Sequence, residues 1–527
     1  MKLPDKHILF VFLVFFSLFG IRLYYVFQKE GLHLDETLSV VLSSCNEYGW
    51  TRIYNEDKIY SGKEVRDSTF FENGSLANAL SDVVRLRADN RDHPHTNLYY
   101  TCLRLWFAGV KSGDMHHIII RGCLLNMLLF VFSFCLMYRL LRLLFKDEWI
   151  VLLGLIVAFL NTAAISATVF IRPYQLQEML FIWLTLLFVR YYRSITTHEK
   201  IDTWQNLLVT ALAGGLVLLS GYFAVFFASM YGAVLLFVSF RKKQKQNIPF
   251  FCGAFFAAFV FVFAFYSNYH SGFFSDRGQE AIAKIPSGHN FASSCFWLLK
   301  QLRQHLFYVA IIIVTAASAG CLLWKKKLHP KKSIREDNML WILIGIAFSW
   351  ATVVTILSPF KDTVRYITPA LPFLSLVIPL IASKWDGSGM RICVLLCYAA
   401  LYGFVALRAD RINYLYQGVE QQMVFNQKPN VPVIVRVDTV FVTCSLVPYM
   451  PDAQKYEFTF SREKALEKTV KYSEVFVLDG LPKEAEKGTP SPEMVFPSCY
   501  AVEKFKIKKA ENFYNGYHLI KTEQIRW

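Results

Sequence analysis

The chain has 527 residues, of which 54% are hydrophobic and 16% aromatic, and its mean hydropathy is +0.33. Repeated long apolar runs at this length exclude an ordinary soluble enzyme and predict a polytopic membrane protein. The net charge of +16 arises from short basic clusters between the apolar runs, a pattern that indicates membrane topology and excludes nucleic acid as the expected partner.

The first apolar run covers residues 8–27 and is long enough to cross a bilayer, which takes about 20 apolar residues. It is too long for the core of a signal peptide and no small-residue cleavage site follows it, so we expect a retained span. Lys2 and Lys6 precede the run, which predicts a cytoplasmic N-terminus. The adjacent acids Asp35 and Glu36 then emerge on the outer face, just beyond the membrane.

A polar stretch follows to about residue 91, and its length predicts short helices within the loop. The tetrapeptide Asp92-His93-Pro94-His95 then leads into a short amphipathic run, 98–110. Ten clearer apolar runs come after it: 118–138, 150–170, 176–189, 207–220, 222–240, 250–266, 306–324, 340–357, 367–382 and 392–407.

Four basic clusters set the orientation of these runs. They lie at 139–146, 190–200, 241–245 and 325–332, and all fall on one side if every run from 118 onward is a single span. By the positive-inside rule that side is cytoplasmic. The first span then ends on the outer face and the run at 118 begins on the same face, so the segment 98–110 between them cannot cross the membrane once. We expect a re-entrant or interfacial helix there.

The same topology places the tail, residues 408–527, outside the cytoplasm. Apolar and polar residues alternate in four segments of this tail, which predicts strands of a small α/β domain. These segments are 433–437, 440–443, 475–478 and 517–520. The predicted fold is therefore mainly α, with a membrane helical bundle over 1–407 that includes an outer loop at 28–97, and a C-terminal extracytoplasmic α/β domain.

Carboxylates and cations gather on the predicted outer face, and this combination suits displacement of a sugar from a lipid phosphate by an acceptor hydroxyl. The acceptor needs a carboxylate base about 3 Å from its oxygen. The phosphate leaving group needs Arg or Lys, because a guanidinium binds phosphate through two parallel hydrogen bonds. Asp35 is the candidate base, and the candidate phosphate ligands are Arg172, Lys361 and Arg365.

Each of these residues also has a simpler interpretation. Arg172 and Arg365 could extend to lipid headgroups, Lys361 could be an ordinary loop charge, and tyrosines near span ends often anchor in the membrane interface. Two histidines at positions 93 and 95 without a third ligand are weak evidence for a metal.

Four motifs resemble one known group of enzymes. Asp35-Glu36 after the first span is similar to the acidic loop of the GT-C membrane glycosyltransferases, in particular glycosyltransferase family 39 and its bacterial relatives, which include protein O-mannosyltransferases and the lipid A aminoarabinose transferase. The other three motifs follow in the family's order as far as about residue 382: Asp92-His93-Pro94-His95 before Leu98-Tyr99-Tyr100, Ile171-Arg172-Pro173-Tyr174, and Arg365-Tyr366 before Pro369-Ala370-Leu371-Pro372.

The resemblance implies a polyprenyl- or dolichyl-phosphate sugar as donor, inversion at the anomeric carbon, catalysis by the Asp35-Glu36 pair with Asp35 as base, and a site on the outer face of a bacterial inner membrane. It implies substrate contacts from Asp92, His93, Tyr174 and Tyr366. One departure is the His-Thr-Asn sequence at 95–97, where a second proline is usual. Another is Asp92-His93, where the aminoarabinose transferase has a Glu-Lys pair whose acid binds metal, so a divalent metal stays an open alternative.

Two other functions compete with sugar transfer. A transporter or lipid flippase would place charges near the bilayer midplane, often in repeated halves, whereas here they gather at outer span ends and no repeat is visible. A non-catalytic scaffold would leave the four motifs unexplained. The sugar is not identified by the sequence, and protein, lipid and glycan acceptors all remain open.

Overall fold

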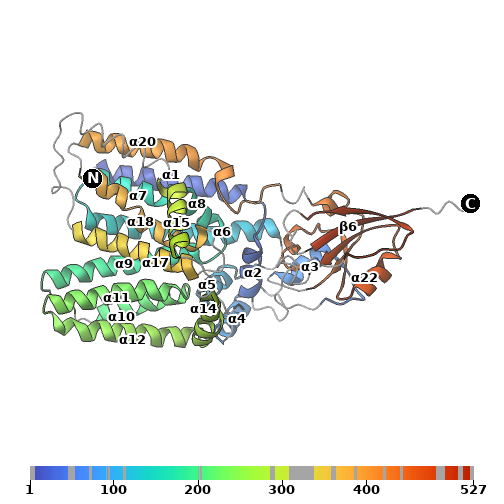
Figure 1. The fold of residues 1–527 in the computed structure, drawn as a ribbon, viewed down its shortest axis with the longest axis horizontal. Helices are drawn as coiled ribbons and strands as arrows, with labels where there is room; N and C mark the ends of the chain where they lie inside the picture. Colours follow the sequence, from blue (N-terminus) through green and yellow to red (C-terminus); the bar gives the residue numbers. More distant parts are fainter. Residues whose placement is uncertain are drawn as a thin grey trace, which may run out of the picture. The chain divides into compact units, whose positions relative to one another are not determined.

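The computed structural model forms two compact units, shown as a ribbon in Figure 1. The first comprises Met1–Val26, Leu86–Tyr99 and Cys123–Asn413, and the second comprises Phe27–Arg85, Tyr100–Gly122 and Tyr414–Trp527. The structure describes residues 6–44, 54–70, 74–88, 90, 92, 95–110, 114–199, 201, 204–284, 291–307, 337–357, 364–384, 388–418, 423–438, 443–481, 493–507 and 514–522.

The first unit is a helical bundle, as predicted. Among the described residues, six helices are long and apolar enough to cross a membrane, and a bent pair could form a seventh span, so the chain is an integral membrane protein. The six helices are α1 (Lys6–Gln28), α6 (Met115–Leu144), α11 (Ala224–Arg241), α12 (Ile248–Phe265), α17 (Asp337–Leu357) and α20 (Ser388–Ala406).

Two further helices of the bundle are α9 (Tyr174–Thr196) and α10 (Trp204–Leu219). Helices α9 to α12 lie alongside one another in Figure 1, with α10 packed against α9 and α12. Aromatic rings fill the space between α9, α11 and α17: Phe181 stacks on Phe227 at 3.9 Å, and Trp350 meets Phe181 edge-on at 5.0 Å. The indole of Trp350 donates to the carbonyl of Phe223, which satisfies its buried N–H.

The apolar run at 150–170 is not one straight span. It forms α7 (Glu148–Phe159) and α8 (Thr162–Val169), which meet at an angle of 57°. Asn161 causes the break, because its side chain accepts a hydrogen bond from the N–H of Ala164 and donates to the carbonyl of Ala158. Arg22 of α1 donates to the carbonyl of Phe159 at 2.7 Å, so the end of α7 keeps a partner inside the bundle.

The run at 367–382 is also interrupted. It forms η6 (Thr368–Ala370), α18 (Leu371–Leu374) and α19 (Val377–Ala382), preceded by η5 (Val364–Tyr366). Prolines at 369, 372 and 379 remove backbone donors and limit each helical segment to a few residues. The predicted run at 306–324 lies outside the described residues except for its first two.

The remaining helices of the first unit are short. They are η2 (Lys245–Asn247), α13 (Tyr269–Ser271), η3 (Gly272–Arg277), α14 (Gly278–Lys284), α15 (Phe291–Leu302), η4 (Arg303–Phe307) and η7 (Ala409–Arg411). The predicted amphipathic run at 98–110 contains α5 (Leu98–Trp106), whose nine residues span ~14 Å, about half of a hydrocarbon core. Its re-entrant placement stays a prediction.

The second unit has a six-stranded sheet in the order β1-β3-β2-β4-β6-β5. The strands are β1 (Ile59–Ser61), β2 (Val433–Arg436), β3 (Lys455–Thr459), β4 (Glu474–Gly480), β5 (Tyr500–Phe505) and β6 (Tyr514–Lys521). Strand β2 runs parallel to β3 and β4 and is buried on both faces, as central parallel strands are; the remaining pairs are antiparallel.

One helix, α22 (Arg462–Thr469), connects β3 to β4 and packs on the sheet through Ala465. Beneath it Ile434, Val475 and Leu519 form a buried core. The other helices of this unit are α2 (Leu34–Ser43), α3 (Gly62–Thr69), α4 (Leu76–Ala88), η8 (Val424–Gln427) and η9 (Val447–Tyr449). The predicted α/β character of the tail is confirmed, and strand β1 adds a segment from the loop at 28–97.

Candidate functional site

A chain of three polar side chains lies where α8 turns into α9. The guanidinium of Arg172, in this turn, is only 3% exposed, and its Nη2 lies 2.8 Å from Nε2 of His95. The other ring nitrogen of His95, Nδ1, lies 2.8 Å from a carboxylate oxygen of Asp92. Since a guanidinium can only donate, the contact with Arg172 favours a His95 that accepts at Nε2, while its Nδ1 faces the Asp92 carboxylate. His95 thereby holds Arg172 in one orientation.

The backbone around His95 is itself fixed by Asn90. The amide of Asn90 donates to the carbonyl of His95 at 2.7 Å, and its oxygen accepts hydrogen bonds from Tyr266 and from the N–H of Asp92, each at 3.1 Å. Asn90 is fully buried. We name Asp92, His95 and Arg172 the polar chain, with Asn90 as its support.

A second guanidinium, that of Arg365 in η5, lies in an aromatic setting. It is 8% exposed and lies 5.7 Å from the ring centre of Phe170 and 5.1 Å from that of Tyr366. Tyr174 stacks on Phe170 at 5.9 Å and meets Tyr366 edge-on at 6.1 Å. Phe170 and Tyr174 flank Arg172 in the sequence, so the structure brings both arginines to the same end of α8 and α9.

Buried polar residues brace the turn that carries Arg172. Thr168, before the turn, donates to the side-chain oxygen of Gln175 after it, and Gln175 donates to Glu178 at 2.7 Å. Arg22 donates to Thr168 at 3.1 Å and covers the ring of Phe130. Arg22 and Glu178 are each 1% exposed, so opposite charges lie within one satisfied network inside the bundle, where unpaired charges would be costly. Hydrogen bonds therefore fix the segments on both sides of the α8–α9 turn, at Thr168 and at Gln175.

This arrangement is suited to binding an anion. A guanidinium presents donors in a planar fork that matches phosphate or carboxylate, and aromatic faces orient it by cation–π contact. Both arginines are buried among protein side chains, whereas an arginine that anchors in the membrane interface extends its side chain to the lipid headgroups.

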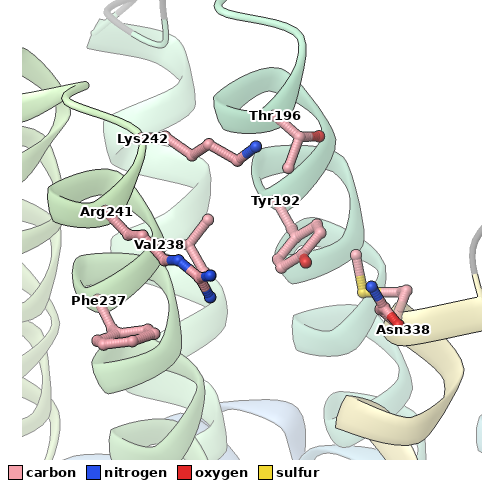
Figure 2. A pocket seen from close by; sticks show the side chains of 8 residues that line it. Tyr192, Thr196, Phe237, Val238, Arg241, Lys242 and Asn338 are labelled. Atoms are coloured by element: carbon pink, nitrogen blue, oxygen red, sulfur yellow. The ribbon is translucent and has the colours of Figure 1, made fainter.

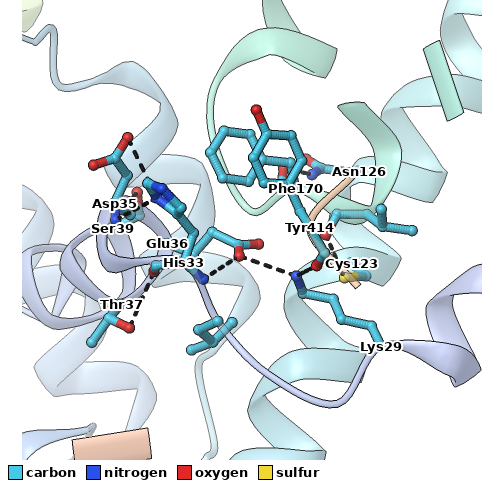
Figure 3. A network of polar contacts seen from close by, with 12 residues as sticks. Lys29, His33, Asp35, Glu36, Thr37, Ser39, Cys123, Asn126, Phe170 and Tyr414 are labelled. Atoms are coloured by element: carbon cyan, nitrogen blue, oxygen red, sulfur yellow. Dashed lines mark hydrogen bonds and ion pairs between the residues drawn. The ribbon is translucent and has the colours of Figure 1, made fainter. Parts of the chain in front are cut away.

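The adjacent acids Asp35 and Glu36 belong to the second unit, where the structure gives them different surroundings. Glu36 is fully buried, and its carboxylate lies 3.0 Å from Nζ of Lys29, also fully buried. The same carboxylate accepts the N–H of His33 at 2.7 Å and completes a capping box at the start of α2. Lys29 also donates to the carbonyl of Tyr414 (Figure 3). One oxygen of Glu36, Oε2, thus accepts hydrogen bonds from both the Lys29 ammonium and the His33 backbone.

Asp35 is the accessible acid of the pair. Its side chain is 25% exposed, and one carboxylate oxygen lies 3.7 Å from Nδ1 of His33, beyond hydrogen-bond distance. That nitrogen instead accepts the backbone N–H of Asp35 at 3.1 Å (Figure 3). His33 Nδ1 therefore carries no proton in this arrangement.

The loop before α2 approaches the tail closely. Tyr449 donates to the carbonyl of Leu32 at 2.9 Å, and a Cβ at Gly31 would lie 2.6 Å from the Tyr449 hydroxyl, so a larger residue there would have to displace that hydroxyl. Burial, followed by the nearby charge of Glu36, raises the pKa of Tyr416 well above its ordinary value. Tyr416 therefore stays neutral beside the two acids at physiological pH.

Two of the predicted site residues, Lys361 and His93, lie outside the described residues. Among the residues that the structure does describe, no group of three or more His, Cys, Asp or Glu side chains is placed to hold a metal ion. Asp92 and His95, which could supply two metal ligands, are within hydrogen-bond distance of each other.

Sequence reasoning did not assign roles to several residues that organise these clusters. His95 was noted only beside His93, and its contact with Arg172 joins positions 77 apart in the chain. Asn90 and Lys29 carried no recognisable motif. The one signal available was the three-residue spacing between Asp92 and His95, which places their side chains near each other if the backbone turns.

No family model and no curated protein matches this chain. Among solved structures, ArnT from Cupriavidus metallidurans, in a crystal structure with bound undecaprenyl phosphate, is similar over 96% of this chain and 97% of that chain. The TM-score is 0.48 and the sequence identity is 9%. With values this low, the chemistry of the present chain has to be inferred from its own residues.

Proposed function

We propose that this protein is a membrane glycosyltransferase of the GT-C type, which moves a sugar from a polyprenyl-phosphate donor to an acceptor hydroxyl on the outer face of the membrane. The observation that carries the proposal is the pair of buried arginines, Arg172 and Arg365, at one end of α8 and α9. Two oriented guanidiniums fit a phosphate leaving group, and the aromatic side chains around Arg365 fit the apolar prenyl chain or the sugar face.

In this proposal the Asp35 carboxylate takes the proton of the acceptor hydroxyl. The acceptor oxygen attacks the anomeric carbon from the side opposite the phosphate, and the carbon–oxygen bond to phosphate breaks. The electron pair leaves with the polyprenyl phosphate, and the configuration at the anomeric carbon inverts. The two guanidiniums stabilise the charge that grows on the phosphate, which lowers the barrier more than it strengthens donor binding.

The remaining predicted residues receive supporting roles. Asp92 and His95 fix the orientation of Arg172, and Tyr174 and Tyr366 line the donor site. Glu36, paired with Lys29 and capping α2, positions the helix that begins beside Asp35. Lys361 and His93 keep their predicted roles as phosphate and substrate ligands, and a divalent metal remains open.

The test is turnover by the purified full chain in lipid nanodiscs, with a panel of radiolabelled polyprenyl-phosphate sugars and a cell-envelope fraction as acceptor. We expect release of polyprenyl phosphate with one donor class. Asp35→Asn should lower that rate by ~10²–10⁴-fold, because the amide cannot accept the proton. The matched control is Glu30→Gln, which removes an exposed acid five residues earlier that accepts the N–H of Gly418.

Two outcomes would contradict the proposal. If the labelled sugar lipid crosses between leaflets of proteoliposomes without cleavage, the protein is a flippase. If Asp35→Asn turns over within a few-fold of the Glu30→Gln control, Asp35 is not the base.

A further inference from the structure

A cavity of about 660 Å³ lies at the opposite end of the helical bundle from the polar chain. It opens between the last turns of α9 and α11 and the first turn of α17, and Figure 2 shows its lining side chains. Tyr192 and Thr196 come from α9, Arg241 from α11 with Lys242 just after it, and Asn338 from α17. These helix ends carry the basic clusters at 190–200 and 241–245, the side predicted to be cytoplasmic.

The charges of the cavity differ from those of its neighbours. At the ends of other helices of the bundle, Arg142 of α6 pairs with Glu148 of α7, and Arg391 of α20 pairs with Asp147, the N-cap of α7. Within the described part of the chain, by contrast, neither Arg241 nor Lys242 has an acidic partner, and no acid lines the cavity. Among the side chains that the structure describes, two cations therefore line the cavity and no acid does, which favours an anionic occupant.

The other lining groups indicate which kinds of anion could bind in the cavity. Tyr192, Thr196 and Asn338 provide hydroxyl and amide groups that can donate hydrogen bonds. The apolar wall includes Phe237, which is 63% exposed on the side of α11. In Figure 2 Lys242 extends from the end of α11 toward Thr196 of α9. The site thus combines cations, hydrogen-bond donors and an apolar exit.

The size also points to more than a bare ion. A volume of about 660 Å³ lies within the ~300–1,000 Å³ range of small-molecule sites. Basic pockets between membrane helices on the cytoplasmic side are known to bind anionic lipid heads, because that leaflet carries negative charge. We infer that this cavity binds the phosphodiester headgroup of an anionic phospholipid from the cytoplasmic leaflet, with an acyl chain leaving along Phe237.

The test uses native mass spectrometry of the full chain released from nanodiscs of phosphatidylcholine with a minority of phosphatidylglycerol. We expect the wild type to retain phosphatidylglycerol over phosphatidylcholine. Arg241→Gln with Lys242→Gln should weaken retention by ~25-fold, at about fivefold for each basic residue near a phosphate. The matched control is Lys243→Gln with Lys245→Gln, which removes the same charge from the same segment outside the cavity and should retain the lipid.

Two further arms separate the sources of phosphate and guard against misfolding. Inorganic phosphate at millimolar concentration should not displace the lipid; displacement would identify a free-anion site and overturn the lipid assignment. Thr196→Val with Asn338→Leu keeps both cations but removes hydrogen-bonding groups, and it should weaken retention while the thermal midpoint stays near that of the wild type. Equal lipid loss in the cavity variant and the matched control would also overturn the inference, since charge alone would then explain retention.

Discussion

The contrast between Asp35 and Glu36 gives the sharpest test of the candidate site, because the two acids are adjacent and their surroundings differ. We consider Glu36→Gln. The Glu36 carboxylate and the Lys29 ammonium lie 3.0 Å apart and are both fully buried. Removing one partner of such a pair leaves a buried charge without compensation and costs about 3–5 kcal/mol. Glutamine can still accept the N–H of His33, so we expect the lower end, about 3 kcal/mol.

That loss should be visible as a thermal shift. For a folded unit of 150–250 residues, each kcal/mol moves the midpoint by ~2–4 °C, so Glu36→Gln should unfold ~6–12 °C below the wild type. Asp35→Asn, at a quarter-exposed position whose contact with His33 spans 3.7 Å, should move it by only a few degrees. Replacing both partners of the buried pair, with Lys29→Met and Glu36→Leu, should recover much of the loss, because no charge is then left buried.

The assay combines scanning fluorimetry in one detergent with donor-dependent turnover below the lowest midpoint. The expected pattern is an inactive but stable Asp35→Asn and an unstable Glu36→Gln whose residual folded fraction still turns over. If Glu36→Gln keeps the wild-type midpoint yet loses activity as Asp35→Asn does, then Glu36 is the proton acceptor and its assignment to positioning is refuted.

Three other predictions can be checked independently. Arg365→Lys keeps a charge but loses the planar fork, so kcat should fall about tenfold, with a larger fall for Arg365→Ala; full activity of the lysine variant would make Arg365 a headgroup anchor. The second unit should lose stability on acidification, because contacts led by the hydrogen bond from Lys464 lower the pKa of Glu56 to about 2 from 4.5. The stability that ionised Glu56 contributes is complete above pH 4.5 and is lost as the pH falls toward 2. In Glu56→Gln, the thermal midpoint should therefore depend less on pH over this range. A cysteine at the exposed Val495 should react with a membrane-impermeant thiol reagent on intact spheroplasts, whereas labelling only after lysis would reverse the predicted topology.

Hydropathy predicted most of the bundle because the bilayer imposes a minimum length on each span. It did not predict the break at Asn161, where one polar side chain both ends α7 and caps α8. The run at 367–382 looked like one span because prolines do not interrupt its hydrophobicity, although they interrupt its hydrogen bonding.

The sequence pattern also predicted only some of the strands in the tail. The apolar core of β4 was visible as a local pattern, whereas β3 mixes Lys455 and Glu457 into a buried strand and was missed. Glu457 is tolerated there because it pairs with Lys468 of α22. Strand β1 joins β3 across nearly 400 positions, and no local pattern reports such a pairing.

For the candidate site, the sequence identified residues that have the right chemistry but not how they are grouped. Arg172 and Arg365 were predicted as phosphate ligands on residue type and motif alone. Phe170 precedes Arg172 by two residues and lies 5.7 Å from Arg365, a contact that forms only when the α8–α9 turn meets η5. Burial separates Glu36 from Asp35, and adjacent residues in a sequence give no sign of that difference.

The hydrogen bond from Arg22 to Phe159 also has a consequence for how the protein is made. The two residues are 137 positions apart, so at ~5–20 residues per second the ribosome needs ~7–27 s to supply the acceptor after the donor. During that interval α1 must enter the lipid with a cation that costs about 2.5–3.5 kcal/mol at the centre of the bilayer. Arg22 lies six residues before the end of α1, near enough for its side chain to reach the headgroups while it waits. Biogenesis therefore gives this arginine two successive partners, first lipid and later the carbonyl of Phe159. Exchange between them couples the docking of α1 to the synthesis of α7.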